Sequence, residues 1–184
     1  MKYCTACGGL LALKVPADED RPRHCCQSCG LVHYQNPKMV VGCIPEWKDR
    51  ILLCLRGIEP QKGLWTLPAG YLENDETLAE GAARETFEEA RARVDNLRPY
   101  RLFNIRHVNQ VYMMFHARLT AKNFAPTPES LEVRLFTENE IPWGALAFPV
   151  IEETLKHYFQ DRTQGIFLFQ VGDIVRRMES TPSA

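Results

Sequence analysis

The chain has little net charge and no long apolar run. Its 22 lysines and arginines against 23 aspartates and glutamates leave a formal net charge of −1 at pH 7, so no basic field attracts nucleic acid or anionic membranes over a distance. No run of about 18 apolar residues occurs. The amino terminus, Met1-Lys2-Tyr3-Cys4, also lacks the apolar stretch of a signal peptide. We therefore expect a cytoplasmic protein with no membrane partner.

The length and composition suit a compact enzyme. A chain of 184 residues that is 45% hydrophobic can bury one core of the usual domain size. Residues 37–176 are expected to form this catalytic domain, residues 1–36 a small metal-binding domain, and residues 177–184 a flexible tail. No internal repeat is present.

Four of the seven cysteines are spaced as metal ligands. Disulfides are disfavoured in the cytosol, whereas Cys4-x2-Cys7 and Cys26-x2-Cys29, eighteen residues apart, can supply four thiolates to a tetrahedral Zn²⁺. Four protein ligands leave no open position for water, so this zinc is predicted to be structural. Its role would be to fold a segment too short to bury a core.

The remaining cysteines and the nearby histidines have no metal role in this interpretation. Cys25 breaks the two-residue spacing and is interpreted as a spare thiol, while Cys43 and Cys54 lie in apolar runs and are predicted to be buried. His24 and His33 flank the second pair and are interpreted as surface residues. A zinc ribbon can also bind nucleic acid, but the charges of this segment are balanced and lack interleaved aromatic residues. Nucleic acid is therefore an unlikely partner.

A helix with a cluster of acidic residues is the most informative feature. Glu85, Glu88 and Glu89 fall at i, i+3 and i+4 in an Ala-rich, Glu-rich segment and should share one helix face. Three adjacent carboxylates repel one another unless a hard cation such as Mg²⁺ binds between them. The alternative to a metal site is that these glutamates form the solvated face of a surface helix. Thr77 and Glu80 have capping-box spacing and predict the helix start. The opposite face should pack on a sheet and consists of Ala79, Ala83, Thr86, Phe87 and Ala90.

The residues around this helix follow a known signature. Gly70, Glu76, Arg84-Glu85 and Glu88-Glu89 resemble the motif G-x5-E-x7-R-E-U-x-E-E-x-G-U of the Nudix hydrolases, where U is a bulky aliphatic residue. Thr86, Arg91 and Ala92 depart from it without removing a charged position. Because Arg91 replaces the glycine that ends the helix, we expect the helix to continue for another turn.

The resemblance implies a fold and a metal site. The fold class is α/β, a Nudix α/β/α sandwich with a mixed β-sheet, preceded by the zinc ribbon. The ligands of a catalytic Mg²⁺ (or Mn²⁺) would be Glu85, Glu88, Glu89 and a main-chain carbonyl of Ala69 or Gly70.

Three further residues receive roles beside the metal ligands. Arg84 should hold carboxylates in place, with phosphate contact as the alternative, and Glu76 should orient the loop before the helix. The general base is either one of the helix glutamates or a residue of the segment 129–132, of which Glu132 is preferred.

Further motifs resemble those of the zinc-ribbon Nudix group that includes ADP-ribose and FAD pyrophosphatases. They lie at residues 34–42, 63–73, 124–126 and 128–132. The resemblance implies hydrolysis of a nucleoside diphosphate linked to another group, releasing AMP and either ribose 5-phosphate or FMN. His107-Val108 stand where many ADP-ribose pyrophosphatases have proline. The S-Q-P-W-P-F-P motif of NADH pyrophosphatases is missing apart from a faint match at Ala147-Phe148-Pro149.

Two other functions stay open. One is the clearance of oxidised nucleoside triphosphates, and the other is a nucleic-acid-binding ribbon attached to a non-catalytic Nudix domain. A homodimer is possible, although no self-complementary patch is visible. Substrate contacts are predicted at Trp65, Tyr112 and Phe148, by stacking, and at Arg56, by binding phosphate. The alternative for each aromatic residue is a place in the core.

The rest of the pattern predicts a mixed sheet. Residues 39–44 and 51–55 should form a hairpin, and residues 111–119 alternate as a strand does. Further strands are expected at 63–67, 100–105, 132–136 and 166–171, and a second helix at 145–159.

Overall fold

The computed structural model describes residues 1–175, which form two compact units. The first is Met1–Pro37 and the second begins at Lys38. The predicted tail, residues 177–184, lies outside the described residues. No helix among the described residues is both long and apolar enough to span a membrane.

The first unit is a small antiparallel sheet with almost no core. Its strands are β1 (Leu11–Lys14), β2 (Arg23–Cys26) and β3 (Val32–His33), in the order β1-β2-β3. The side chains that it buries are those of Cys4 and Cys26. Apolar burial therefore supplies little of the stability of this unit.

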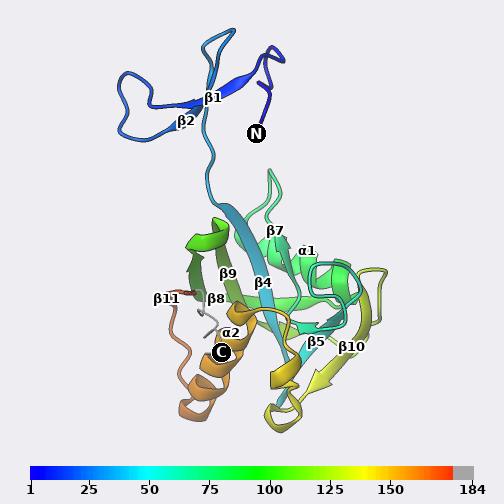
Figure 1. The fold of residues 1–184 in the computed structure, drawn as a ribbon. Coiled ribbons are helices and arrows are strands. Elements are labelled where there is room, and N and C mark those ends of the chain that lie inside the picture. Colours follow the sequence, from blue (N-terminus) through cyan, green and yellow to red (C-terminus); the bar gives the residue numbers. More distant parts are fainter. Residues whose placement is uncertain (176–184) are drawn as a thin grey trace, which may run out of the picture. The chain divides into compact units, whose positions relative to one another are not determined.

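The second unit contains a mixed sheet, which in residues 38–175 has eight strands (Figure 1). Six of them follow the order β10-β5-β4-β9-β8-β11, while β6 pairs with β5 and β7 with β4. The strands are β4 (Lys38–Trp47), β5 (Arg50–Arg56), β6 (Trp65–Thr66), β7 (Ala69–Tyr71), β8 (Val94–Ile105), β9 (Gln110–Leu119), β10 (Ser130–Phe136) and β11 (Gln170–Asp173).

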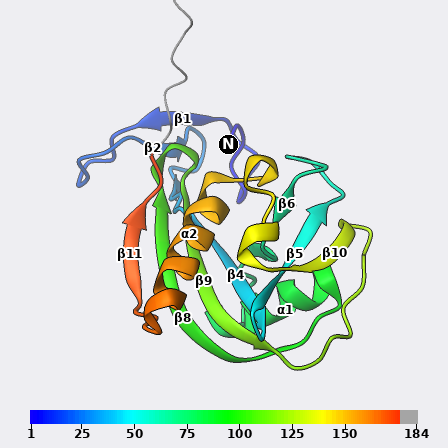
Figure 2. The ribbon, with the colours of Figure 1, turned by 90° about the horizontal axis from the view of Figure 1, so that it is seen from below.

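Two helices cover opposite faces of this sheet. Figure 2 shows α1 (Leu78–Ala90) and α2 (Pro149–Gln164) on either side of the central strands β4 and β9. These strands are parallel and in register from Lys38↔Gln110 to Glu46↔Arg118. The predicted hairpin is formed by β4 and β5, with Glu46 opposite Ile51. The prediction of an α/β fold with a mixed sheet between helices is therefore confirmed.

The alternation predicted for residues 111–119 separates two cores. On β9, Met113 and Phe115 pack in the cluster that includes Ala82 of α1, whereas Met114 packs in the cluster that includes Leu155 of α2. Successive strand residues point to opposite faces of a sheet. This one strand therefore supports both helices.

Helix α1 begins as predicted and ends earlier than predicted. Thr77 Oγ1 accepts the Glu80 main-chain N–H at 3.2 Å, and Glu80 Oε2 accepts the Thr77 N–H at 2.8 Å. The expected extra turn past Arg91 is wrong. Arg91 takes the left-handed conformation, with φ 54°, and its N–H donates to the Phe87 carbonyl at 2.8 Å. Arg91 thus performs the capping role that glycine usually has.

The predicted packed face of α1 is also partly wrong. The buried residues are Gly81, Ala82, Thr86, Glu89 and Ala90. Phe87 is instead half-buried, and the guanidinium groups of Arg91 and Arg93 lie 5.4 and 5.0 Å from the centre of its ring. Thr86 is fully buried, and its hydroxyl donates to the Ala82 carbonyl at 2.8 Å.

Three elements in the second half of the chain differ from the predicted ranges. Strand β8 begins six residues before residue 100, at Val94. Helix α2 begins at Pro149 because a short 3₁₀ helix, Trp143–Ala145, precedes it and proline favours the first helical position. The last strand, β11, begins at Gln170. Before it, the Leu168 carbonyl accepts a hydrogen bond from Arg101 Nη1 at 2.6 Å, and not from the main chain of a neighbouring strand.

Candidate active site

Two of the predicted metal ligands, Glu85 and Glu89, lie where α1 packs against β7. Strand β7 pairs with β4 so that Gly70 lies opposite Val41. The Glu85 carboxylate lies directly against the Gly70 α-carbon, at the place a β-carbon would occupy. The absence of a side chain at Gly70 therefore lets a helix carboxylate reach the main chain of Ala69 and Gly70.

Glu89 is buried rather than solvated. The residue is only 7% exposed, and its Oε2 accepts the Ala69 N–H at 3.3 Å. Burial, together with the negative charge of Glu85, raises the pKa of Glu89 to about 8. Glu85 and Glu89 both face β7, because Glu85 lies against Gly70 and Glu89 accepts the Ala69 N–H. The expectation of one shared helix face stands, but the sheet covers part of that face.

Arg84 joins the carboxylates around the helix. Its Nη1 donates to Glu85 Oε1 at 2.8 Å and to Glu88 Oε2 at 2.9 Å. Its Nε and Nη2 donate to the two oxygens of Glu76 at 2.9 and 2.7 Å, and Nη2 also donates to the Tyr71 carbonyl at 3.1 Å. The Arg84 guanidinium therefore fixes the orientation of three carboxylates.

The three glutamates differ in exposure. The side chain of Glu88 is 53% exposed and that of Glu85 only 12%, and burial raises the pKa of Glu85. Within residues 1–175 the three carboxylates do not form a group with all ligand atoms within 4.8 Å of one another. Burial is the main cause of the raised pKa values of Glu85 and Glu89, and a bound cation would favour their charged forms. This donor set fits a hard divalent cation, with main-chain carbonyls available at Ala69 and Gly70.

A cavity of about 790 Å³ opens beside β7. Ala69, Gly70 and Tyr71 line one part of it, and Ile105, Val150 and Ile174 line an apolar part. The dimensions and mixed lining are those of a small-molecule site.

Three of the four predicted substrate contacts line this cavity: Arg56, Tyr112 and Phe148. The Arg56 guanidinium lies 5.2 Å from the centre of the Phe148 ring, and its Nε donates to the Pro60 carbonyl at 2.8 Å. Trp65 is not among the lining residues. Its ring packs edge-on against Phe136, with centroids 4.8 Å apart, so the core alternative holds for Trp65.

The structure separates the two glutamates of the segment 129–132. Glu132 is an exposed residue of β10 and lies opposite Leu55. Glu129 precedes that strand, and its negative charge contributes to the raised pKa values of both Glu85 and Glu89. The charge of Glu129 therefore acts on Glu85 and Glu89, whereas no such effect is found for Glu132.

Several cavity residues were not predicted. Tyr71 is 47% exposed, its hydroxyl accepts Gln110 Nε2 at 3.1 Å, and the Lys38 ammonium lies 4.7 Å from its ring centre. Glu152 lines the same cavity and accepts Lys156 Nζ at 2.6 Å. The position of Tyr71, directly after Gly70, was the sequence signal that could have revealed it.

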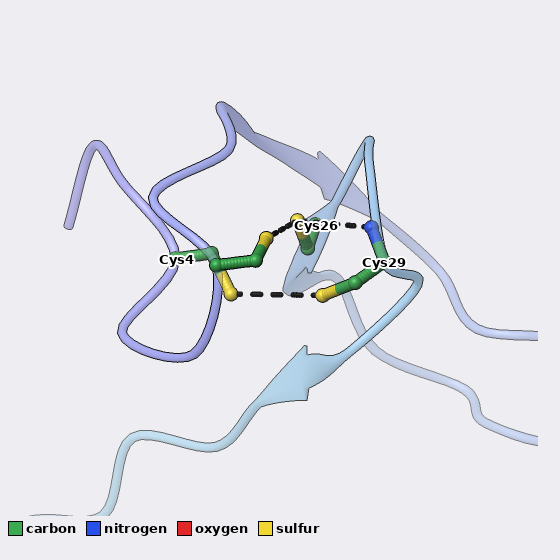
Figure 3. Close-up of side chains that lie close together, drawn as sticks. Cys4, Cys26 and Cys29 are labelled. Carbon is green, nitrogen blue, oxygen red and sulfur yellow. Dashed lines mark hydrogen bonds between the residues drawn. The ribbon is translucent and has the colours of Figure 1, made fainter.

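The four predicted zinc ligands meet in the first unit. Cys4, Cys7, Cys26 and Cys29 have all sulfurs within 4.8 Å of one another. Figure 3 shows the thiols of Cys4, Cys26 and Cys29 turned toward one another. The Cys4–Cys29 and Cys7–Cys26 sulfur distances are 3.8 and 3.4 Å, near the edge of about 3.8 Å of a tetrahedron with zinc–sulfur bonds of about 2.3 Å. The cluster therefore fits Zn²⁺.

The neighbours of the cluster were only partly predicted. Cys43 and Cys54 are fully buried, as expected, and Cys25 lies outside the four-cysteine group. His33, however, is half-buried, and its Nε2 lies 3.3 Å from Cys4 Sγ. This hydrogen bond lowers the pKa of the Cys4 thiol to about 6. Interpreting His33 as a surface residue was therefore wrong.

Family comparisons agree with this geometry. The model described as "Nudix N-terminal", a zinc ribbon, matches residues 2–35, and the model of the NUDIX domain matches residues 36–158. The chain belongs to the Nudix hydrolases. A solved NUDIX hydrolase from Nitrosomonas europaea is 52% identical, covers 95% of this chain and 99% of its own, and superposes with a TM-score of 0.91.

More distant relatives have named activities. The protein called NAD-capped RNA hydrolase NudC from Photobacterium profundum is 27% identical over 158 residues, which are 83% of this chain and 58% of that protein. The protein of the same name from Vibrio vulnificus is 27% identical over 88% of this chain and 62% of its own. The chain thus spans about three fifths of the length of these relatives. An ADP-ribose pyrophosphatase from Streptococcus suis, 19% identical with a TM-score of 0.57, covers 76% of this chain and all of its own, and shares the fold.

Proposed function

We propose that this chain hydrolyses the pyrophosphate bond of a nucleoside diphosphate linked to another group, such as ADP-ribose or FAD, and releases AMP. The observation that carries the proposal is the contact between the Glu85 carboxylate and Gly70 at the edge of the 790 Å³ cavity. Residues 37–176 would be the catalytic domain, and residues 1–36 would have a structural role.

The metal ligands in this proposal are Glu85, Glu88, Glu89 and a carbonyl of Ala69 or Gly70. Bound there, Mg²⁺ or Mn²⁺ would neutralise pyrophosphate charge and lower the pKa of a coordinated water. Arg84 keeps the carboxylates in place through its hydrogen bonds to Glu85 and Glu88. Arg56 lines the cavity and can bind a substrate phosphate.

The cavity lining supports a substrate with at least one planar ring. Tyr71, Tyr112 and Phe148 present aromatic surface to the cavity, and stacking on such rings favours a nucleobase or a flavin. The similarity to proteins named NAD-capped RNA hydrolases makes a nicotinamide dinucleotide the second candidate substrate.

The test offers ADP-ribose, FAD, NADH and an oxidised dGTP side by side with Mg²⁺ and identifies the products by chromatography. We expect AMP from ADP-ribose and FAD. Turnover of the oxidised dGTP alone would favour the clearance of damaged triphosphates and contradict the proposal.

A pair of variants on one helix tests the metal site. Glu88→Gln should abolish turnover while circular dichroism shows an intact fold. Glu80→Gln should remain active, because glutamine can also complete a capping box. A fully active Glu88→Gln protein would contradict the ligand assignment.

A second pair addresses the general base. We assign this role to Glu129 rather than Glu132, because the charge of Glu129 acts on Glu85 and Glu89. Glu129→Gln should lower kcat by about 100-fold or more, while Glu132→Gln should leave it near the wild-type value. The reverse result would identify Glu132 as the general base. If both variants remain active, the general base is one of the helix glutamates.

A further inference from the structure

A histidine lies beside the zinc ligands without being one of them. His33 is one of the two residues of β3, and it lies opposite His24 of the neighbouring strand β2. Its Nε2 is 3.3 Å from Cys4 Sγ, which is a suitable distance for an N–H to sulfur hydrogen bond. The strand pairing therefore fixes the imidazole ring against one of the four cysteines.

Such a contact matters because of the charge of the centre. Four thiolates around one Zn²⁺ carry two more negative than positive charges, and this excess resides on the sulfurs. Donors that point at the sulfurs stabilise the thiolates and orient them toward the metal. The unit that holds them buries almost no apolar surface, so packing does little to keep the ligands in place.

The sulfurs receive these donors unevenly. Cys26 Sγ accepts the main-chain N–H groups of Ser28 and Cys29, both at 3.4 Å, as is usual within a tight turn. For Cys4 the side-chain partner outside the cysteines is His33. In residues 1–175, no other side chain apart from the cysteines makes a hydrogen bond to any of the four sulfurs.

We propose that His33 is a positioning residue for the zinc centre, whose Nε2–H donates to the Cys4 thiolate, fixes that tautomer of the ring and slows the loss of the metal. The proposal does not depend on the hydrolase activity. The ring would need a proton on Nε2, because the thiolate has only lone pairs to offer.

Three variants of the full chain test this role. His33→Leu removes the donor, and His33→Gln keeps an N–H at similar reach. His24→Leu is the matched control, because His24 is a half-buried histidine on the neighbouring strand and, among the described residues, makes no hydrogen bond to the four sulfurs. Zinc transfer to a chromogenic chelator should be about 10-fold faster or more in His33→Leu. The His33→Gln protein should be intermediate, and the His24→Leu protein should match the wild type.

A spectroscopic measurement separates hydrogen bonding from loss of fold. In the cobalt-substituted protein, the sulfur-to-cobalt charge-transfer band should move to lower energy in His33→Leu, because a thiolate without a donor holds its electrons less tightly. Equal release rates and an unchanged band would overturn the proposal. If His33→Leu does not fold, nitrogen NMR of the zinc-loaded wild type decides, since a ring protonated only on Nδ1 would also overturn it.

Discussion

Arg84 holds the Glu76 carboxylate through two parallel hydrogen bonds, from Nε to Oε2 at 2.9 Å and from Nη2 to Oε1 at 2.7 Å. The main-chain N–H of Glu73 donates to the same carboxylate at 2.8 Å. The loop before α1 is thereby tied to the residue that also orients Glu85 and Glu88. The pKa of Glu76 falls to about 2, mainly because of the hydrogen bonds from Arg84.

This lowered pKa predicts a pH dependence of stability. A carboxyl whose pKa is lower in the folded state stabilises the fold above its unfolded pKa, and this contribution is lost as pH falls through the folded pKa. The Glu76 contribution should therefore disappear between about pH 4.5 and pH 2. Denaturant unfolding of Glu76→Gln should show a shallower loss of stability over this interval than the wild type. The control is Glu73→Gln, because the Glu73 side chain makes no hydrogen bond among the described residues; equal slopes in all three proteins would reject the coupling.

Gly70→Ala should damage activity more than stability. A β-carbon at this position would occupy the place of the Glu85 carboxylate, so the carboxylate must move away. A displacement of about 1 Å at a catalytic site can lower kcat/KM by about 100-fold, which a turnover assay with ADP-ribose or FAD would detect. Gly144→Ala is the control, because an added β-carbon there meets nothing within 4 Å. Wild-type activity in Gly70→Ala would show that the close approach is not needed.

The left-handed residue that ends α1 predicts an unusual order of stability for two variants. Arg91→Ala and Arg91→Gly both lose the contact with the Phe87 ring, but only alanine keeps the strain of φ 54°. Arg91→Gly should therefore be more stable than Arg91→Ala by about 1 kcal/mol. Arg93 stacks on the same ring but does not have a positive φ. The Arg93→Ala protein should therefore be at least as stable as the Arg93→Gly protein. The same ranking at both positions in denaturant unfolding would contradict this explanation.

Removal of zinc should unfold one unit of the chain and leave the other folded. The first unit buries only Cys4 and Cys26, whereas the second has apolar clusters on both faces of its sheet. A strong chelator should therefore collapse the dispersed NMR signals of β1 to β3, while the signals of β4 to β11 persist. Adding zinc back should restore the lost signals. Retention of all signals in the metal-free protein would refute a structural role for the metal.

Features encoded over a few neighbouring residues were predictable from the sequence. The capping box of Thr77 and Glu80 spans one helical turn, and each cysteine pair spans a single tight turn, so local geometry alone determines them. The strand at β9 was equally clear, because its apolar residues are consecutive in the sequence and a strand buried on both faces needs apolar residues on both.

Features that depend on distant segments were not predictable. The burial of Glu89 requires β7 to lie over the helix, and the place of Trp65 in the core requires Phe136, which is 71 positions later in the chain. The contact of His33 with Cys4 likewise joins residues 29 positions apart. The left-handed conformation of Arg91 was missed for another reason, because arginine has no intrinsic preference for it.

Two glycines, Gly42 and Gly70, permit close approaches between β4, β7 and the acidic helix α1. A β-carbon at Gly42 would collide with Ala69, just as one at Gly70 would collide with Glu85. Strand β4 therefore approaches Ala69 of β7 closely at Gly42, and the Glu85 side chain of α1 reaches the main chain of β7 at Gly70. Grafting the acidic helix alone onto another scaffold should not transfer its chemistry, because β4 with Gly42 and β7 with Gly70 would have to be transplanted with it.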